Sequence, residues 1–81
     1  MRAPDPPSFA RSSVLLAARV RELRSERDLS QEQLALAADV DRTYVSQIER
    51  DAGNPSLRVL CKLADALGVP LCALICTERA G

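Results

Sequence analysis

Residues 29–50 carry the clearest helix signals of this stretch of chain and read LSQEQLALAADVDRTYVSQIER. Ser30 is followed three residues later by Gln33, which is the pattern of a capping box. In such a box each side chain bonds a backbone N–H group that the first helical turn leaves free. The pattern therefore predicts a short helix that begins directly after Ser30 and ends near Ala38.

The second half of the same stretch predicts another short helix. Asp41 is a favoured N-cap residue, so the helix is expected to begin at Arg42. Val45, Ile48 and Glu49 then fall on one face of it. Because only Asp39 and Val40 separate the first helix from this cap, the pair must cross at a steep angle.

The residues before this stretch continue the helical pattern. Leu16, Val20 and Leu23 recur at spacings of four and three, which predicts a helix from Val14 to Arg27 or Asp28. Residues 1–12 hold three of the five Pro residues and are interpreted as a flexible arm. One alternative is an arm that reaches DNA through Arg2 and Arg11.

Two further helices are expected after the stretch. Residues 51–55 are rich in turn formers, Ser56 is a cap for a fourth helix, and Gly68 is a stop signal. Pro70 opens a short fifth helix. The sequence therefore predicts an all-α domain of five helices over residues 13–77, followed by a tail at 78–81.

Composition narrows the classes of function. The chain has 81 residues, enough for one small domain, and only 2% of them are aromatic. Few aromatic rings argue against a protein that stacks unpaired bases. A formal net charge of zero counts against nucleic-acid binding in general, although one basic face is still possible on a neutral chain. No catalytic motif is recognised, so we expect no enzyme activity.

The sequence contains three cysteines and no histidine. Cys61, Cys72 and Cys76 are interpreted as small hydrophobic residues of a core or an interface, although a metal site or a redox switch is an alternative. With no histidine to complete a set of four ligands, we expect no metal and no cofactor. No apolar run is long enough to span a bilayer, so a cytoplasmic protein without membrane association is expected.

The start of the third helix carries side chains that suit the major groove of DNA, which admits one α-helix. Arg42 has the fork that matches guanine, and the methyl group of Thr43 matches that of thymine. Gln47 is able to bond adenine through two hydrogen bonds. These three residues are the candidates for base contact, whereas a merely solvated helix start is the alternative.

Residues 29–50, followed by NPSLRVLCKLADALGV at 54–69, resemble the Cro/repressor-type helix-turn-helix (XRE) family, whose fold is the lambda-repressor-like domain. The resemblance covers residues 14–76. Within it, DRTYVSQIER is most similar to the controller proteins of restriction–modification systems, which are small dimeric regulators of their own operon. The resemblance therefore implies a transcriptional regulator that binds double-stranded DNA.

The resemblance also implies roles for matching residues. Those expected to contact the DNA backbone are Gln31, Tyr44, Ser46, Asn54 and Arg58. Gln31 is also expected to brace the recognition helix. Arg24 and Glu49 match an internal ion pair between the first and third helices. Asp39 departs from the family, which usually has Gly at this turn, and a small loss of stability is expected if the position needs a positive φ.

A regulator of this kind is expected to act as a homodimer on a palindromic operator. Leu71, Leu74 and Ile75 are the candidates for the dimer interface, although the same residues could form intramolecular core. RNA polymerase or the product of a neighbouring gene is a further possible partner. An alternative is an antitoxin or partner-binding regulator, which uses the same fold mainly to hold another protein.

Overall fold

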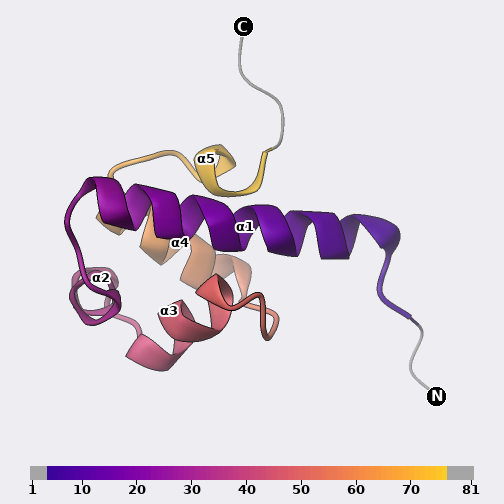
Figure 1. Ribbon diagram of the computed structural model, residues 1–81, viewed down its shortest axis with the longest axis horizontal. Coiled ribbons are helices and arrows are strands. Elements are labelled where there is room, and N and C mark those ends of the chain that lie inside the picture. The colour runs from indigo at the N-terminus through magenta and orange to yellow at the C-terminus, as the bar shows by residue number, and fades with distance from the viewer. Residues whose placement is uncertain (1–3, 77–81) are drawn as a thin grey trace, which may run out of the picture.

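The computed structural model describes residues 4–76, and over these residues it contains five helices and no strand (Figure 1). The all-α, five-helix prediction is therefore confirmed. The helices are α1 (Pro7–Glu26), α2 (Gln31–Ala38), α3 (Arg42–Glu49), α4 (Leu57–Leu67) and α5 (Cys72–Ile75).

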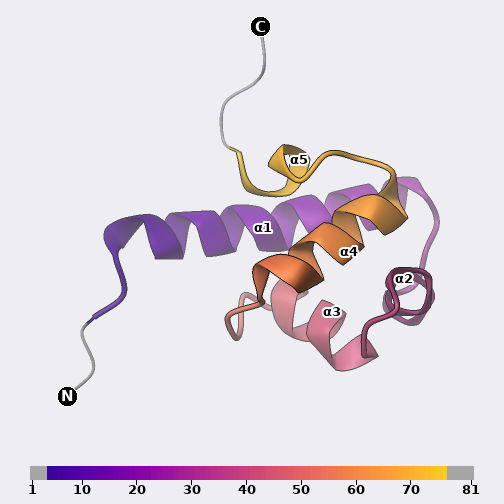
Figure 2. The same cartoon turned by 180° about the vertical axis from the view of Figure 1, so that it is seen from behind.

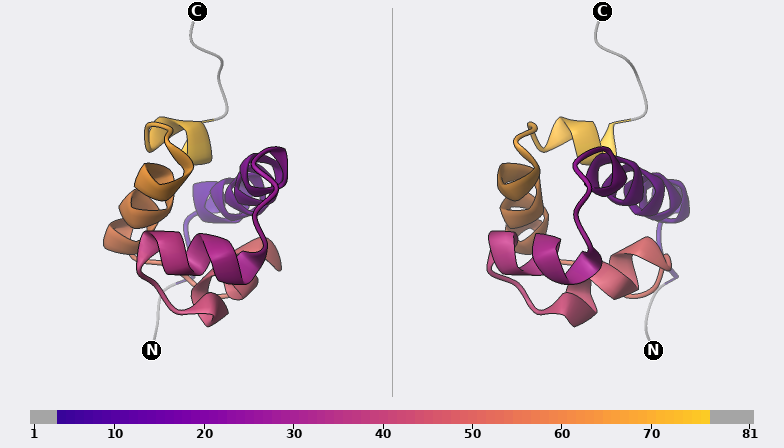
Figure 3. Two further views of the ribbon diagram at one scale, coloured as in Figure 1. Left: turned by 90° about the vertical axis from the view of Figure 1, so that its left-hand side faces the viewer. Right: turned by 60° about the vertical axis from the view of Figure 1, so that its left-hand side comes forward.

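The long helix α1 is the central element of the bundle. It packs against α3 and α5, while α2 packs against α3 and α4. Figures 1 and 2 show α2 and α3 on one side of α1 and α5 on the other, with α4 crossing one face of α1. The α2–α3 pair therefore forms one end of the molecule, as both views in Figure 3 also show.

The predicted caps set the boundaries of the middle helices. The Ser30 hydroxyl accepts from the Gln33 N–H at 3.0 Å, and the Ser30 N–H donates to the Gln33 side-chain oxygen at 2.8 Å. The hydroxyl of Ser56 accepts from the Val59 N–H at 3.2 Å. Gly68 ends α4 with a φ of 72°, which costs a glycine little. These helix starts and stops are confirmed.

The first helix begins earlier than the sequence indicated. It starts at Pro7 rather than Val14, so residues 7–12, predicted as part of a flexible arm, are helical. Proline fits the first helical position because its φ is already helical and its missing N–H would have no partner there. Phe9 is half-buried and lines the same surface pocket as Leu16. Arg2 and the predicted tail lie outside the described residues.

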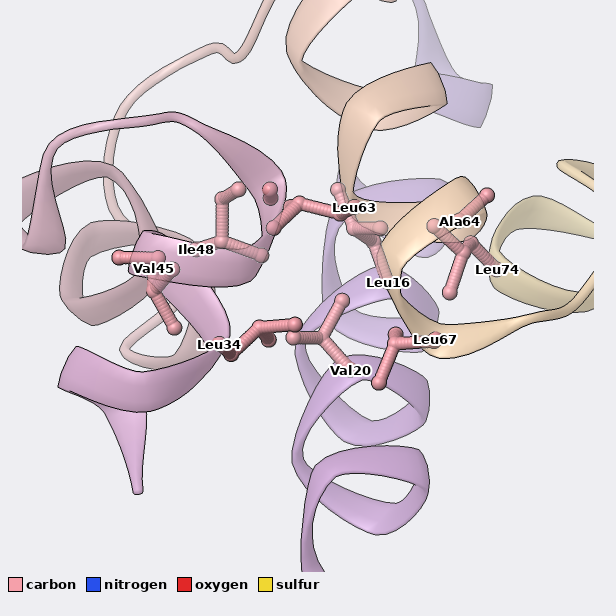
Figure 4. Close-up of a cluster of buried hydrophobic side chains, with 11 residues drawn as sticks. Leu16, Val20, Leu34, Val45, Ile48, Leu63, Ala64, Leu67 and Leu74 are labelled. Carbon is pink, nitrogen blue, oxygen red and sulfur yellow. The ribbon is translucent and has the colours of Figure 1, made fainter. Parts of the chain in front are cut away.

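The core lies where all five helices meet. Its largest fully buried side chains are Leu34, Leu63, Leu74, Val20 and Val45 (Figure 4). Leu74 corrects a prediction, because it was expected in a dimer interface and is 0% exposed within one chain. α5 lies against α1 and α4, so its inward residue fills the core and has no surface left for a second copy. Leu71 is half-buried and Ile75 is 36% exposed.

Candidate nucleic-acid interface

The turn between α2 and α3 is tight because Asp39 takes a left-handed conformation, with φ 57° and ψ 48°. The N–H of Val40 then donates to the Ala35 carbonyl at 3.0 Å and closes the end of α2. Lys62 on α4 donates to the Asp39 carbonyl at 3.3 Å. An aspartate therefore occupies a backbone conformation that glycine adopts at lower cost.

The start of α3 lies on the surface. Arg42 and Thr43 are exposed, and Tyr44 retains 45% of its accessible surface. Gln47, one turn further along, is half-buried and lines a shallow surface hollow together with Thr43 and Tyr44. The subunit itself leaves this polar flank uncovered, as contact with base edges requires.

Asp41 fixes where this flank begins. Its carboxylate accepts from the Thr43 N–H at 3.0 Å. This hydrogen bond to the backbone lowers the pKa of Asp41 below its usual range, and the charge of Arg42 lowers it further. The cap therefore remains ionised at neutral pH and holds the first turn of α3.

Four of the five backbone-contact candidates lie on α3 or after it in the chain. Asn54 lines a second hollow with Tyr44 and Gln47, so these three lie together. Arg58 is exposed in the first turn of α4, and Ser46 is half-buried on α3. Ser46 lies on α3, and Asn54 and Arg58 follow α3 along the chain. Their contacts with DNA stay predictions.

The far end of α3 is buried and anchored. Glu49 is 3% exposed, and Arg24 on α1 grips its carboxylate with two hydrogen bonds, of 2.6 Å from Nε and 2.9 Å from Nη2. Arg24 also donates to the Leu29 carbonyl at 2.7 Å, so one side chain joins three segments. The ion pair that the resemblance implied is present in this structure.

The pKa of Glu49 reflects a balance between burial of the carboxylate and its hydrogen-bonding and charged partners. Burial is the largest single influence and acts to raise the pKa, because it disfavours the charged form. The hydrogen bonds from Arg24 and Gln31, with the charges of Arg24 and Arg21, outweigh burial and lower the pKa. The hydrogen bond between Arg24 and Glu49 also raises the pKa of Arg24. Glu49 is therefore ionised at neutral pH.

Gln31 was expected both to brace the third helix and to contact a phosphate. Its amide nitrogen donates to Glu49 Oε1 at 3.1 Å, so it braces α3 from the start of α2. A primary amide carries two N–H donors, and the second is available to another acceptor. The bracing contact is thus observed, and the phosphate contact stays a prediction.

Two anchoring contacts were missed at the level of sequence. Arg21 donates to the Glu49 carbonyl at the end of α3, and the Ser13 hydroxyl donates to the Asp51 carboxylate in the following loop. The partners are 28 and 38 residues apart. Periodicity and capping rules concern near neighbours, so they carried no signal for either contact.

The cysteines were expected in a core or an interface. Cys61 is half-buried, whereas Cys72 and Cys76 are exposed in the single chain and are not core residues. Their place in an interface stays a prediction. Between residues 4 and 76 there is no group of three or more potential metal-ligating side chains. Nor is any helix in that part of the chain both long and apolar enough to cross a bilayer.

Comparisons with known proteins all identify the same family. The family model described as helix-turn-helix matches residues 20–74. The immunity repressor protein of Bacillus phage phi105 is 45% identical over 60 residues, which cover 74% of this chain and 42% of the repressor. The control protein C.BamHI of Bacillus amyloliquefaciens is 46% identical over 57 residues, which cover 69% of this chain and 70% of that protein.

A solved structure supports the same relationship. The restriction-modification controller protein C.AhdI from Aeromonas hydrophila superposes with a TM-score of 0.74 and 43% identity. The match covers 78% of this chain and 96% of that one. The similarity therefore extends to nearly the whole of a small controller protein but to less than half of the phage repressor.

Proposed function

Because the chain belongs to the helix-turn-helix family, a family of DNA-binding regulators rather than enzymes, we propose that it inserts the start of α3 into the major groove of double-stranded DNA. The observation that carries this proposal is the exposed, polar flank at Arg42, Thr43 and Tyr44 on a helix whose other end is buried. A free flank is available to base edges, and a fixed far end keeps it in one orientation.

The proposed contacts divide by chemistry. Arg42, Thr43 and Gln47 read base edges, since their donors and methyl group match groups displayed in the major groove. Contacts to phosphates set the position of the protein along the duplex and carry no sequence information directly. The residues proposed for that task are Gln31, Tyr44, Ser46, Asn54 and Arg58.

We further propose that two copies bind a palindromic operator. A two-fold dimer would place its two α3 helices about 34 Å apart, one turn of DNA. Ile75 is an exposed apolar residue on α5, and α5 lies on the side of α1 away from α2 and α3 (Figure 3). A dimer formed there would leave both DNA-contacting flanks uncovered, with Leu71 and Ile75 as its apolar contacts.

The proposed biological role is a restriction–modification controller. The chain matches most of the length of C.BamHI and nearly all of C.AhdI, which are a control protein and a controller protein by name. It spans only 42% of the phage repressor. We therefore propose a role as a small regulator of its own operon, and RNA polymerase is a proposed partner at the promoter.

The test is a gel shift on the DNA upstream of the chain's own gene, with unrelated DNA of the same length as competitor. Arg42→Ala is expected to weaken specific binding by about 1–3 kcal/mol and to relax specificity at one base position. Equal binding to both DNAs before the substitution would refute direct readout.

A matched control removes the same charge from another helix. Arg19 lies on α1 and forms a 3.7 Å ion pair with Glu22. Arg19→Ala lowers net charge as Arg42→Ala does, but it leaves α3 intact. It is expected to keep the preference for the upstream DNA, so a loss equal to that of Arg42→Ala would show that only overall charge matters.

A further inference from the structure

The loop between α3 and α4 (residues 50–56) lies mostly on the surface. Its residues from Asp51 to Asn54 are all exposed, and two of them have a positive φ, 56° at Asp51 and 83° at Gly53. Exposed segments with little apolar burial are the parts of a fold that open most easily. Asn54, proposed above as a backbone contact, lies in this loop, so its position depends on what holds the loop in place.

On one side the loop is held by α3 itself. The Asp51 N–H donates to the Ile48 carbonyl at 3.0 Å. The Ala52 N–H donates to the Gln47 carbonyl at 2.8 Å. A β-carbon built at Gly53 would lie 3.6 Å from the side-chain oxygen of Gln47, so the loop backbone lies close to that side chain. The first half of the loop therefore lies next to a residue that is proposed to contact a base.

On the other side the loop is held by α1. The Ser13 hydroxyl donates to the Asp51 carboxylate, although the two residues are 38 positions apart in the chain. Ser13 also lines one surface pocket with Asn54 and Pro55, which places this turn of α1 beside the second half of the loop. Figures 1 and 2 show the loop below the N-terminal half of α1. The part of α1 that begins earlier than predicted therefore brings a hydroxyl donor to the loop.

From this arrangement we propose that Ser13 is a positioning residue for DNA binding, which holds Asp51 and thereby the loop that presents Asn54 to a phosphate. A hydrogen bond to a charged carboxylate is stronger than one between neutral groups. A loop held in one conformation before binding loses less conformational entropy when the complex forms. The inference rests on the proposed function, because it concerns the same DNA-contacting surface. Ser13 itself is not expected to contact the DNA.

The first measurement is made on the full chain without DNA. NMR relaxation gives order parameters for the backbone N–H groups of residues 51–54. In Ser13→Ala these order parameters are expected to fall from the value of a rigid backbone, about 0.85, towards those of a flexible one, below about 0.6. Ser13→Thr keeps a hydroxyl donor and is expected to retain the rigid values. Unchanged order parameters in Ser13→Ala would overturn the inference, whatever the DNA assay shows.

The second measurement is a double-mutant cycle for binding to the upstream DNA. Ser13→Ala is expected to weaken binding about 3- to 10-fold, because one hydrogen bond to a phosphate is then poorly formed. Asn54→Ala is expected to weaken binding by a similar factor. The double variant is expected to bind no more weakly than Asn54→Ala alone, since both substitutions remove the same contact. Ser13→Thr is expected to bind as the unaltered chain does.

Ser12→Ala is the matched control, since Ser12 is an exposed serine one position earlier on the same helix. It is expected to change neither the order parameters nor the affinity. Urea unfolding and sedimentation check that each variant keeps its fold and its oligomeric state. Losses that multiply in the double variant, or an equal loss in Ser12→Ala, would overturn the inference and leave the proposed function in place. Equal binding of the unaltered chain to upstream and unrelated DNA would refute the proposed function, and this inference with it.

Discussion

The two ends of α3 contrast in exposure and in how they are held. At its start, Arg42 and Thr43 are exposed, and the helix is held by the local Asp41 cap. At its end, Glu49 is 3% exposed and tied to α1 and α2 by hydrogen bonds from side chains far away in sequence. One end is available to a partner and the other belongs to the scaffold.

This difference separates orientation from recognition. A helix that reads DNA needs a polar start that the subunit leaves free, and an end that cannot rotate. Substitutions at the anchored end should therefore change stability, and substitutions at the free end should change binding.

The largest effect is expected from Arg24→Ala. It leaves the Glu49 carboxylate buried without its main partner, and removing one half of a buried pair costs about 3–5 kcal/mol. Urea unfolding followed by circular dichroism measures the loss. Arg19→Ala is the control, because its 3.7 Å surface pair with Glu22 is worth under about 1 kcal/mol. Similar losses in both variants would mean that the anchored end is no more than a surface contact.

A smaller effect on the free energy of unfolding is expected when the pH is lowered. The pKa of Glu49 in the folded chain lies below its ordinary value of 4.5, so its contribution to stability is complete above that value. This contribution is lost as pH falls through the folded pKa, because protonation then removes the charge that Arg24 and Gln31 stabilise. The free energy of unfolding of the unaltered chain and of Glu49→Gln, measured from pH 7 to pH 3, isolates the contribution of the Glu49 charge. If the free energies of unfolding of the two proteins differ by the same amount at every pH, the prediction is contradicted.

At the free end, Asp41→Ala should be milder than Arg24→Ala. It removes the side-chain acceptor for the Thr43 N–H, but this exposed N–H can donate a hydrogen bond to water instead. The melting temperature should fall slightly, while Asp41→Asn, which keeps an acceptor oxygen, should preserve it. A fall as large as that of Arg24→Ala would show that the start of α3 is structural as well.

The smallest effect is expected at the turn before α3. Asp39 has a φ of 57°, so Asp39→Gly should relieve strain and raise the unfolding free energy by less than about 1 kcal/mol, part of it offset by the freer unfolded chain. Asp39→Ala at the same position should lower it. Thermal unfolding compares the two variants, and equal stability would mean that the left-handed turn carries no strain.

Much of the middle of the fold was predictable because its signals are local. The caps at Ser30, Asp41 and Ser56 and the stop at Gly68 act over three or four residues, and each element boundary follows them. The start of α1 was not predictable in the same way. Three prolines suggested an arm, but Pro7 is compatible with a first helical turn and Phe9 lines a surface pocket with Leu16.

The candidate site shows the same division. The order of polar and apolar residues in α3 identified Arg42 and Thr43 as outward-facing and placed Val45, Ile48 and Glu49 together on the face that is buried. The sequence did not show whether Leu74 is buried in the core or whether Cys72 and Cys76 are exposed. Nor did it show that Arg21 donates a hydrogen bond to the end of α3.

Local signals were enough to place the starts and ends of the middle helices and to identify the polar face of α3, because capping and amphipathic spacing depend on residues within one or two turns. The apolar side chains that the core buries and the partners that bind Glu49 are set by the folded arrangement of all five helices. Those outcomes depend on how helices that are distant in sequence pack together, and no local pattern encodes that packing.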